Sequence, residues 1–138
     1  MNDRVFIDTY IVTYAHVSNE SEKNGIASAL LKDKLADARI WISTQILSEF
    51  YSSMTKNKHE HDNIVEYIHA ITERANVIPV SLATVESALR IKEKYQFSYW
   101  DSLMLSAALE SRCEVVYTED LQHNQVIESK LTILNPFL

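Results

Sequence analysis

The sequence predicts an α/β fold in which a parallel sheet of about five strands carries helices on both faces. Strand-like and helix-like patterns alternate along the C-terminal half of the chain, which is typical of parallel βα units. The chain has only one glycine and two prolines, so the connections are expected to be short. Its 138 residues suit one domain, residues 1–138, with a real hydrophobic core.

The first half of the chain is expected to form two strands and four helices. Two short apolar runs predict strands at residues 5–7 and 40–43. The helices are expected at residues 10–15, 22–35, 45–55 and 62–75. Thr44 is the expected N-cap of the third helix, because its hydroxyl can accept a hydrogen bond from a free backbone N–H.

The second half is expected to form three strands and two helices. The strands are predicted at residues 77–80, 115–118 and 131–134. Pro79 indicates an edge position or a strand end, because proline cannot donate to a neighbouring strand. Ser81 is expected to cap a helix over residues 82–95. Ser98 and Asp101 have the spacing of a capping-box variant, which predicts a helix that ends near Ser111.

Composition narrows the class of protein. There is no secretory signal and no apolar stretch long enough to cross a bilayer, so a cytoplasmic protein that does not enter membranes is expected. The net charge of −6 argues against a broad basic surface for nucleic acid. Divalent cations can nevertheless make an acidic site attract phosphate. Lys56 and Lys58 end one predicted helix, either as solvated side chains or as a phosphate-contacting edge.

Four acids follow predicted strands or begin predicted helices, where open α/β sheets hold their ligands. Each alone has a structural explanation, as a helix cap, a loop acid or a solvated helix residue. Carboxylates that converge on one rim repel one another unless a cation joins them. Their coincidence therefore predicts a shared metal site made of Asp8, Glu49, Asp101 and Asp120.

Oxygen ligands favour Mg²⁺ or Mn²⁺. The five histidines and the single cysteine show no zinc-type spacing, and the lone glycine, Gly25, excludes glycine-rich phosphate loops. A carboxylate-held Mg²⁺ recruits phosphate and activates a water molecule as nucleophile. The acids therefore predict phosphodiester hydrolysis.

Four segments resemble the PIN-domain nucleases, and within them the VapC-type toxins of prokaryotic toxin–antitoxin pairs. The segments are VFIDT (5–9), QILSEF (45–50), YWDSL (99–103) and VYTEDLQH (116–123). The resemblance covers nearly the whole chain and implies a PIN-like three-layer α/β/α sandwich. It also implies Mg²⁺- or Mn²⁺-dependent RNA cleavage by an activated water, a homodimer, and inhibition by a small DNA-binding antitoxin.

By motif position, the resemblance assigns the metal site to Asp8, Glu49, Asp101 and Asp120. It gives Thr118 a supporting role by hydrogen bonding, with Thr9 beside it. Glu119 either faces solvent or joins this supporting layer. Many relatives have asparagine where this chain has Tyr10. Either the Tyr10 hydroxyl replaces the asparagine amide, or the loss of the amide weakens the support of the site. Asn124 stands where a glycine is common, and asparagine tolerates the left-handed turn expected there.

The leading hypothesis is thus a metal-dependent endoribonuclease that acts as a toxin on RNA. The alternative is a catalytically inert PIN module that binds a protein or RNA partner. A phospho-accepting signalling domain fits poorly, because no lysine follows the strand at 115–118 until Lys130. Trp100 is expected in the core rather than as a platform on which bases stack, and the same holds for Phe6, Trp41 and Tyr117.

Overall fold

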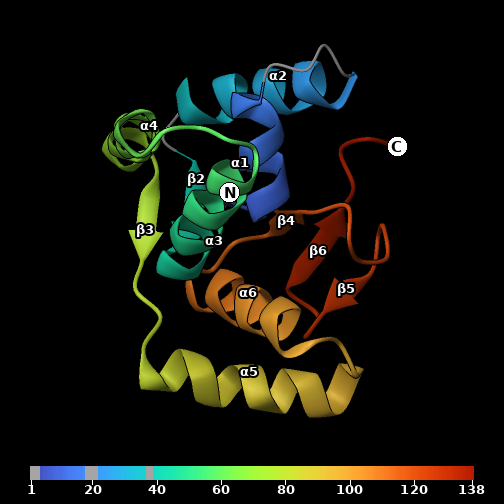
Figure 1. The fold of residues 1–138 in the computed structure, drawn as a ribbon. Helices are drawn as coiled ribbons and strands as arrows, with labels where there is room; N and C mark the ends of the chain where they lie inside the picture. Colours follow the sequence, from blue (N-terminus) through green and yellow to red (C-terminus); the bar gives the residue numbers. More distant parts are fainter. Residues whose placement is uncertain (1–3, 18–21, 37–38) are drawn as a thin grey trace.

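The computed structural model describes residues 4–17, 22–36 and 39–138. Its centre is a six-stranded sheet with the order β3-β2-β1-β4-β6-β5 (Figure 1). All neighbouring strands are parallel except β5 and β6. The strands are β1 (Val5–Ile7), β2 (Ile40–Ser43), β3 (Asn76–Ile78), β4 (Val115–Tyr117), β5 (Val126–Ile127) and β6 (Leu131–Leu134).

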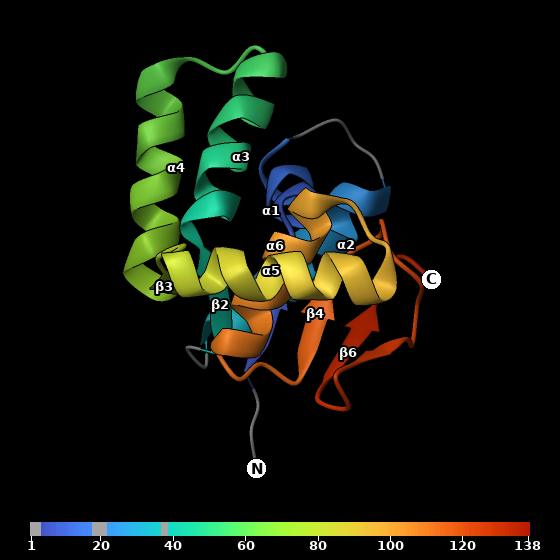
Figure 2. The same cartoon turned by 90° about the horizontal axis from the view of Figure 1, so that it is seen from below.

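Helices cover both faces of this sheet. The helices are α1 (Thr9–His16), α2 (Glu22–Ala36), α3 (Thr44–Lys56), α4 (His61–Arg74), α5 (Leu82–Tyr95) and α6 (Tyr99–Glu110). Figure 1 shows α5 and α6 together on one side of the sheet and α1 and α2 on the other. Figure 2 shows α3 and α4 side by side as a helical hairpin, with α3 rising from β2 and α4 leading down to β3. None of the described helices is both long and apolar enough to cross a membrane.

The predicted fold class is therefore confirmed, with one correction to the sheet. The sequence predicted about five parallel strands, and the structure adds the antiparallel strand β5 at one edge. β5 has only two residues, too few to show an alternating apolar pattern. At the opposite edge, Pro79 directly follows β3, which agrees with the predicted edge or strand end.

Local caps explain where the helices begin. Ser81 and Thr84 form a reciprocal capping box on α5, and the Ser98 hydroxyl accepts from the Asp101 N–H at the start of α6. The predicted Thr44 cap of α3 is wrong by one residue. Ser43 is the N-cap and accepts from Ile46 N–H. Thr44 instead accepts a hydrogen bond from the backbone N–H of Val80.

The core joins the sheet to both helical layers. Phe6 and Ile7 of the central strand β1 are fully buried, as are Phe50 of α3 and Leu105 of α6. Burial of each such side chain contributes roughly 1.5–3 kcal/mol. The strand order reverses direction between β1 and β4, since β2 and β3 lie on one side of β1 and β4 and β6 on the other. In open α/β sheets, a crevice forms at such a point beyond the carboxyl ends of the strands.

Candidate active site

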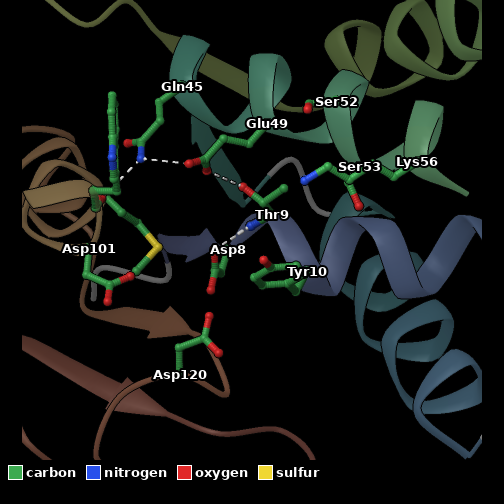
Figure 3. Close-up of a pocket in the computed structure, with 12 residues that line it drawn as sticks. Asp8, Thr9, Tyr10, Gln45, Glu49, Ser52, Ser53, Lys56, Asp101 and Asp120 are labelled. Carbon is green, nitrogen blue, oxygen red and sulfur yellow. Dashed lines mark hydrogen bonds between the residues drawn. The ribbon is translucent and has the colours of Figure 1, made fainter. Parts of the chain in front are cut away.

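A pocket of about 440 Å³ lies at this reversal point. Its walls come from the carboxyl ends of β1 and β4, from α3 and from the start of α6. Figure 3 shows the acidic side chains approaching the pocket from several elements. The lining residues are Asp8, Thr9, Tyr10, Gln45, Glu49, Ser52, Ser53, Lys56, Trp100, Asp101, Met104 and Asp120.

Asp8 lies at the junction of β1 and α1. It is the N-cap of α1, and its Oδ1 accepts from Thr9 N–H at 2.6 Å. Its Oδ2 accepts from the Thr118 hydroxyl at 2.6 Å. The same hydroxyl oxygen accepts from the backbone N–H of Asp120 at 3.2 Å. Thr118 is fully buried and thereby fixes Asp8 relative to the loop that carries Asp120.

Glu49 is held by neighbours on two elements. Its Oε1 accepts from the Thr9 hydroxyl at 2.7 Å, and its Oε2 accepts from Gln45 Nε2 at 3.4 Å. Gln45 Nε2 also donates to the backbone oxygen of Trp100 at 3.1 Å. Figure 3 shows the bonds of Gln45 and Thr9 to Glu49 as dashed lines. This chain of hydrogen bonds links α3 to α1 and to α6.

Asp101 lies in the first turn of α6, where the free backbone N–H groups favour a negative charge. Its own N–H donates to the Ser98 hydroxyl, and Asp101 lines the pocket. Asp120 follows β4 in an exposed loop across the pocket. No lysine or arginine forms an ion pair with Asp8, Asp101 or Asp120 in the part of the chain that the structure describes.

The surroundings disfavour negative charge on these three aspartates. Burial raises the pKa of Asp8 to about 7, and repulsion from Asp120 and Asp101 adds to the rise, against the hydrogen bonds from Thr118 and Thr9. Burial also raises the pKa of Asp101. Burial raises the pKa of Asp120 as well, followed by repulsion from Asp101 and Glu119. A bound cation would relieve this repulsion.

The donor set fits a hard divalent cation, because its charged groups are carboxylates and none of them forms an ion pair with a lysine or arginine among the described residues. The types of the ligand atoms suit such a cation, but the positions of the side chains do not form a complete coordination shell. Among the described residues, no three His, Cys, Asp or Glu side chains are arranged to hold a metal ion. Mg²⁺ usually keeps several water ligands and is bound through one or two carboxylates, so this arrangement still suits such an ion.

The structure brings most of the predicted site residues together. Asp8, Thr9, Tyr10, Glu49, Asp101 and Asp120 line the pocket, and Thr118 supports it from behind. Glu119 does not line it. Its carboxylate accepts from the Tyr14 hydroxyl at 2.5 Å and from Lys23 Nζ at 2.6 Å. Tyr10 is half exposed and, within the described residues, makes no hydrogen bond to the acids.

Several lining residues were not among the residues assigned to the metal site or its support from the sequence. Gln45, Ser52, Ser53 and Lys56 lie on the same face of α3 as Glu49. Their spacing from Glu49 is close to whole helical turns, and this signal could have identified them. Lys56, expected either as a solvated side chain or as a phosphate-contacting edge, is exposed and lines this pocket. Trp100 was predicted in the core and is instead 61% exposed.

Two of the comparisons with known proteins identify relatives. The PIN domain family matches residues 5–128 of the chain. Among curated proteins, none matches. Solved structures with the same fold include a toxin–antitoxin complex from Klebsiella pneumoniae, with a TM-score of 0.71 and 17% sequence identity. That likeness covers 96% of this chain and 97% of the other.

Two further structures are similar at low sequence identity. One is VapC20 of Mycobacterium tuberculosis, described as a sarcin-ricin loop cleaving toxin, with a TM-score of 0.69, 16% identity and coverage of 84% of this chain and 91% of that one. The other is VapBC2 of Rickettsia felis bound to a DNA fragment from its promoter, with a TM-score of 0.70, 15% identity and coverage of 95% and 98%. These structures share the fold of this chain.

Proposed function

The chain belongs to the PIN-domain family, and from this premise we propose that it is a metal-dependent endoribonuclease, the toxin of a toxin–antitoxin pair. PIN domains are typically nucleases and generally depend on metal. The observation that carries the proposal is the convergence of four carboxylates, without a cationic partner among the described residues, on one pocket at the reversal point of the sheet.

Asp8, Asp101 and Asp120, together with Glu49, would hold Mg²⁺ or Mn²⁺. When bound, such an ion lowers the pKa of a coordinated water and stabilises charge on the phosphoryl oxygens. Oxygen donors from four separate elements suit this class of ion. Thr118 would keep Asp8 and the Asp120 loop in register while the carboxylates close around the ion.

The remaining side chains would orient the water and the RNA. Thr9 and Gln45 hold both oxygens of Glu49, so its carboxylate is oriented to accept a proton from the attacking water. Lys56 is exposed and lines the same pocket, eleven helical positions after Gln45. Its ammonium group would bind a phosphate next to the scissile one.

The partners follow from the same family. Fold neighbours include a toxin–antitoxin complex and a toxin–antitoxin pair bound to promoter DNA. We therefore expect a small cognate antitoxin that binds DNA, a homodimer of this chain, and a cytoplasmic location. An antitoxin arginine placed among the acids would form paired hydrogen bonds with a carboxylate and compete with the metal.

The test is cleavage of total RNA by the purified protein freed of antitoxin, with Mn²⁺, with Mg²⁺ and with EDTA. We expect discrete products that require metal. They should disappear in Asp101→Asn, because this change replaces the carboxylate with a neutral amide of similar size. Circular dichroism and thermal melting establish that the variant is folded. Equal cleavage by folded Asp101→Asn, or cleavage that persists in EDTA, would contradict the proposal.

Two observations favour a second candidate, an inert PIN module that binds a protein or RNA. The described residues contain no ready-made metal cluster, and Tyr10 adds no hydrogen bond to the acids. Calorimetric titration with Mn²⁺ separates the two candidates. Binding that is lost in Asp101→Asn supports the nuclease, whereas the absence of any binding to the wild-type protein supports the inert module.

A further inference from the structure

The two tryptophans of the chain have contrasting surroundings. Trp41 lies in β2 and is partly buried against the core, with the Arg4 guanidinium 5.0 Å above its ring. Trp100 lies in the first turn of α6 and is 61% exposed. Large aromatic side chains are normally buried to a much greater extent. Its exposure therefore calls for a functional explanation.

Trp100 stands between two hollows. It lines the pocket that holds the four acids, which we call the acid pocket. It also lines a second, more apolar hollow of about 510 Å³, which we call the outer pocket. The two hollows share Gln45, Glu49, Ser52 and Trp100. The remaining walls of the outer pocket are Thr44, Ser48, Val80 and Leu103. The acid pocket and the outer pocket therefore lie side by side, with these four shared residues between them.

The indole is held in place although it is exposed. Its ring meets the Tyr99 ring edge-on, with centroids 5.1 Å apart and an interplanar angle of 74°. The backbone oxygen of Trp100 accepts from Gln45, which also holds Glu49. A flat apolar surface is thus fixed to the same hydrogen-bond chain that orients a carboxylate of the site.

We propose that Trp100 is a stacking platform for an unpaired RNA base next to the scissile phosphate, with that base lying in the outer pocket. The proposal deepens the proposed function and rests on it. An occupant of this place meets carboxylates on one side and an apolar, aromatic wall on the other. A nucleotide matches both sides, because its phosphate can join the acid site through a metal while its ring lies flat on the indole.

The same reasoning sets the substrate class. Bases are available for stacking in loops and single strands, whereas they are hidden within an A-form duplex. Because every base has a π-face, stacking alone favours unpaired RNA without selecting one base strongly. The described walls of the outer pocket add one charged group, Glu49, which is already bonded to Thr9 and Gln45. We therefore infer a preference for unpaired RNA with only weak selection among the bases, in favour of purines, whose larger rings stack more strongly.

The test measures RNA affinity with cleavage prevented by EDTA. In a Trp41→Phe protein, Trp100 is the sole tryptophan, so its fluorescence reports on the platform. An oligoadenylate strand should quench this fluorescence, and an abasic strand of equal length and charge should not. Trp100→Ala should weaken oligoadenylate binding about ten-fold and leave abasic binding unchanged. With Mn²⁺ and RNA substrate, the same variant should raise KM and leave kcat nearly unaltered.

Matched variants separate stacking from other roles of the side chain. Trp100→Phe keeps an aromatic face and should retain most of the affinity, whereas Trp100→Leu keeps an apolar surface and should behave like alanine. Leu82→Ala removes another exposed apolar side chain, 73% exposed and outside both pockets, and should change nothing. Because Trp100 is mostly exposed, these proteins should melt within a few degrees of the wild type.

The outcomes distinguish this inference from the proposed function. Metal-dependent cleavage by the wild type, with unchanged oligoadenylate affinity and KM in Trp100→Ala, would overturn the stacking role and leave the nuclease intact. A changed oligomeric state or antitoxin affinity in that variant would then assign Trp100 to a protein interface. Equal affinities of Trp100→Leu and Trp100→Phe would also overturn stacking. A wild-type protein that neither binds nor cleaves RNA would contradict both proposals.

Discussion

Neighbouring acids at the end of β4 have opposite environments. Glu119 is paired with Lys23 and accepts from Tyr14. Burial alone would raise the pKa of Glu119, but these hydrogen bonds outweigh it and lower that pKa. Asp120 has no ion-pair partner among the described residues, and burial and repulsion raise its pKa. One acid pairs with a cation of this chain, and the other is proposed to bind a cation from outside.

The same division holds across the molecule. Glu128 is bonded to Lys94 and Tyr95, and the Lys94 hydrogen bond lowers its pKa. It attaches the turn between β5 and β6 to α5. Asp8 and Asp101 resemble Asp120, with pKa values raised mainly by burial. We call Glu119 and Glu128 the paired acids, and Asp8, Asp101 and Asp120 the pocket acids. The paired acids hold elements together through their cationic partners, whereas burial disfavours the charged form of the pocket acids.

The largest expected effect comes from removing the support of the pocket acids. Thr118→Val keeps the shape of the side chain but loses the hydrogen bond to Asp8 and the acceptor for Asp120 N–H. We expect Mn²⁺ affinity, measured by calorimetry, to fall roughly 10- to 100-fold. The free energy of unfolding should also drop by about 1–3 kcal/mol. Thr118→Ser keeps the hydroxyl and should retain most of the Mn²⁺ affinity and most of the free energy of unfolding. Unaltered Mn²⁺ binding in Thr118→Val would limit Thr118 to a structural role.

Much of this comparison was within reach of the sequence, because it depends on local patterns. Short apolar strands that alternate with helices predicted the sheet, and chain position placed Asp8 and Asp120 beyond the ends of β1 and β4. Asn124, expected to allow a left-handed turn, has φ of 71°. These features need only neighbours along the chain. The convergence of the acids then follows from the parallel arrangement of the strands.

The rest depends on contacts between distant residues. The sequence left Glu119 undecided because its partner Lys23 lies 96 positions away. Trp100 was misplaced because nearly the whole of α6 after it is buried, from Ser102 to Ala108. A helix so apolar shows no polar face from which the exposed side can be recognised. Only the position of α3 and Val80 beside the start of α6 reveals that the Trp100 ring remains open.

A second prediction concerns Asp8 and the pH dependence of the free energy of unfolding. The pKa of Asp8 is about 7 when folded and near 3.8 as an ordinary aspartate. Between these values the folded protein holds a proton that the unfolded chain has released, so stability falls as pH rises and levels off above about 7. Asp8→Asn has no carboxyl group at this position, so its stability lacks this pH dependence. Without metal at pH 8, we expect Asp8→Asn to be more stable than wild type by about 1–2 kcal/mol.

Chemical denaturation in EDTA at pH 4, 6 and 8 measures this difference. His16 adds its own pH dependence, because burial lowers its pKa, but both proteins contain it and the difference cancels its contribution. Added Mn²⁺ should reverse the order, since a cation stabilises only the protein with the complete set of carboxylates. A stability difference that does not change between pH 4 and pH 8 would contradict the assigned role of Asp8 burial.

The smallest expected effect comes from the paired acid next to Asp120. Glu119→Gln removes the charge that attracts Lys23 and leaves the pocket lining untouched. The Lys23 side chain is 45% exposed, and partly exposed ion pairs contribute less than about 1 kcal/mol. We expect a small loss of stability, with Mn²⁺ affinity and RNA cleavage close to wild type. A loss of Mn²⁺ binding as large as that of Thr118→Val would instead mean that Glu119 leaves Lys23 to bind the metal. Glu119 would then belong to the pocket acids.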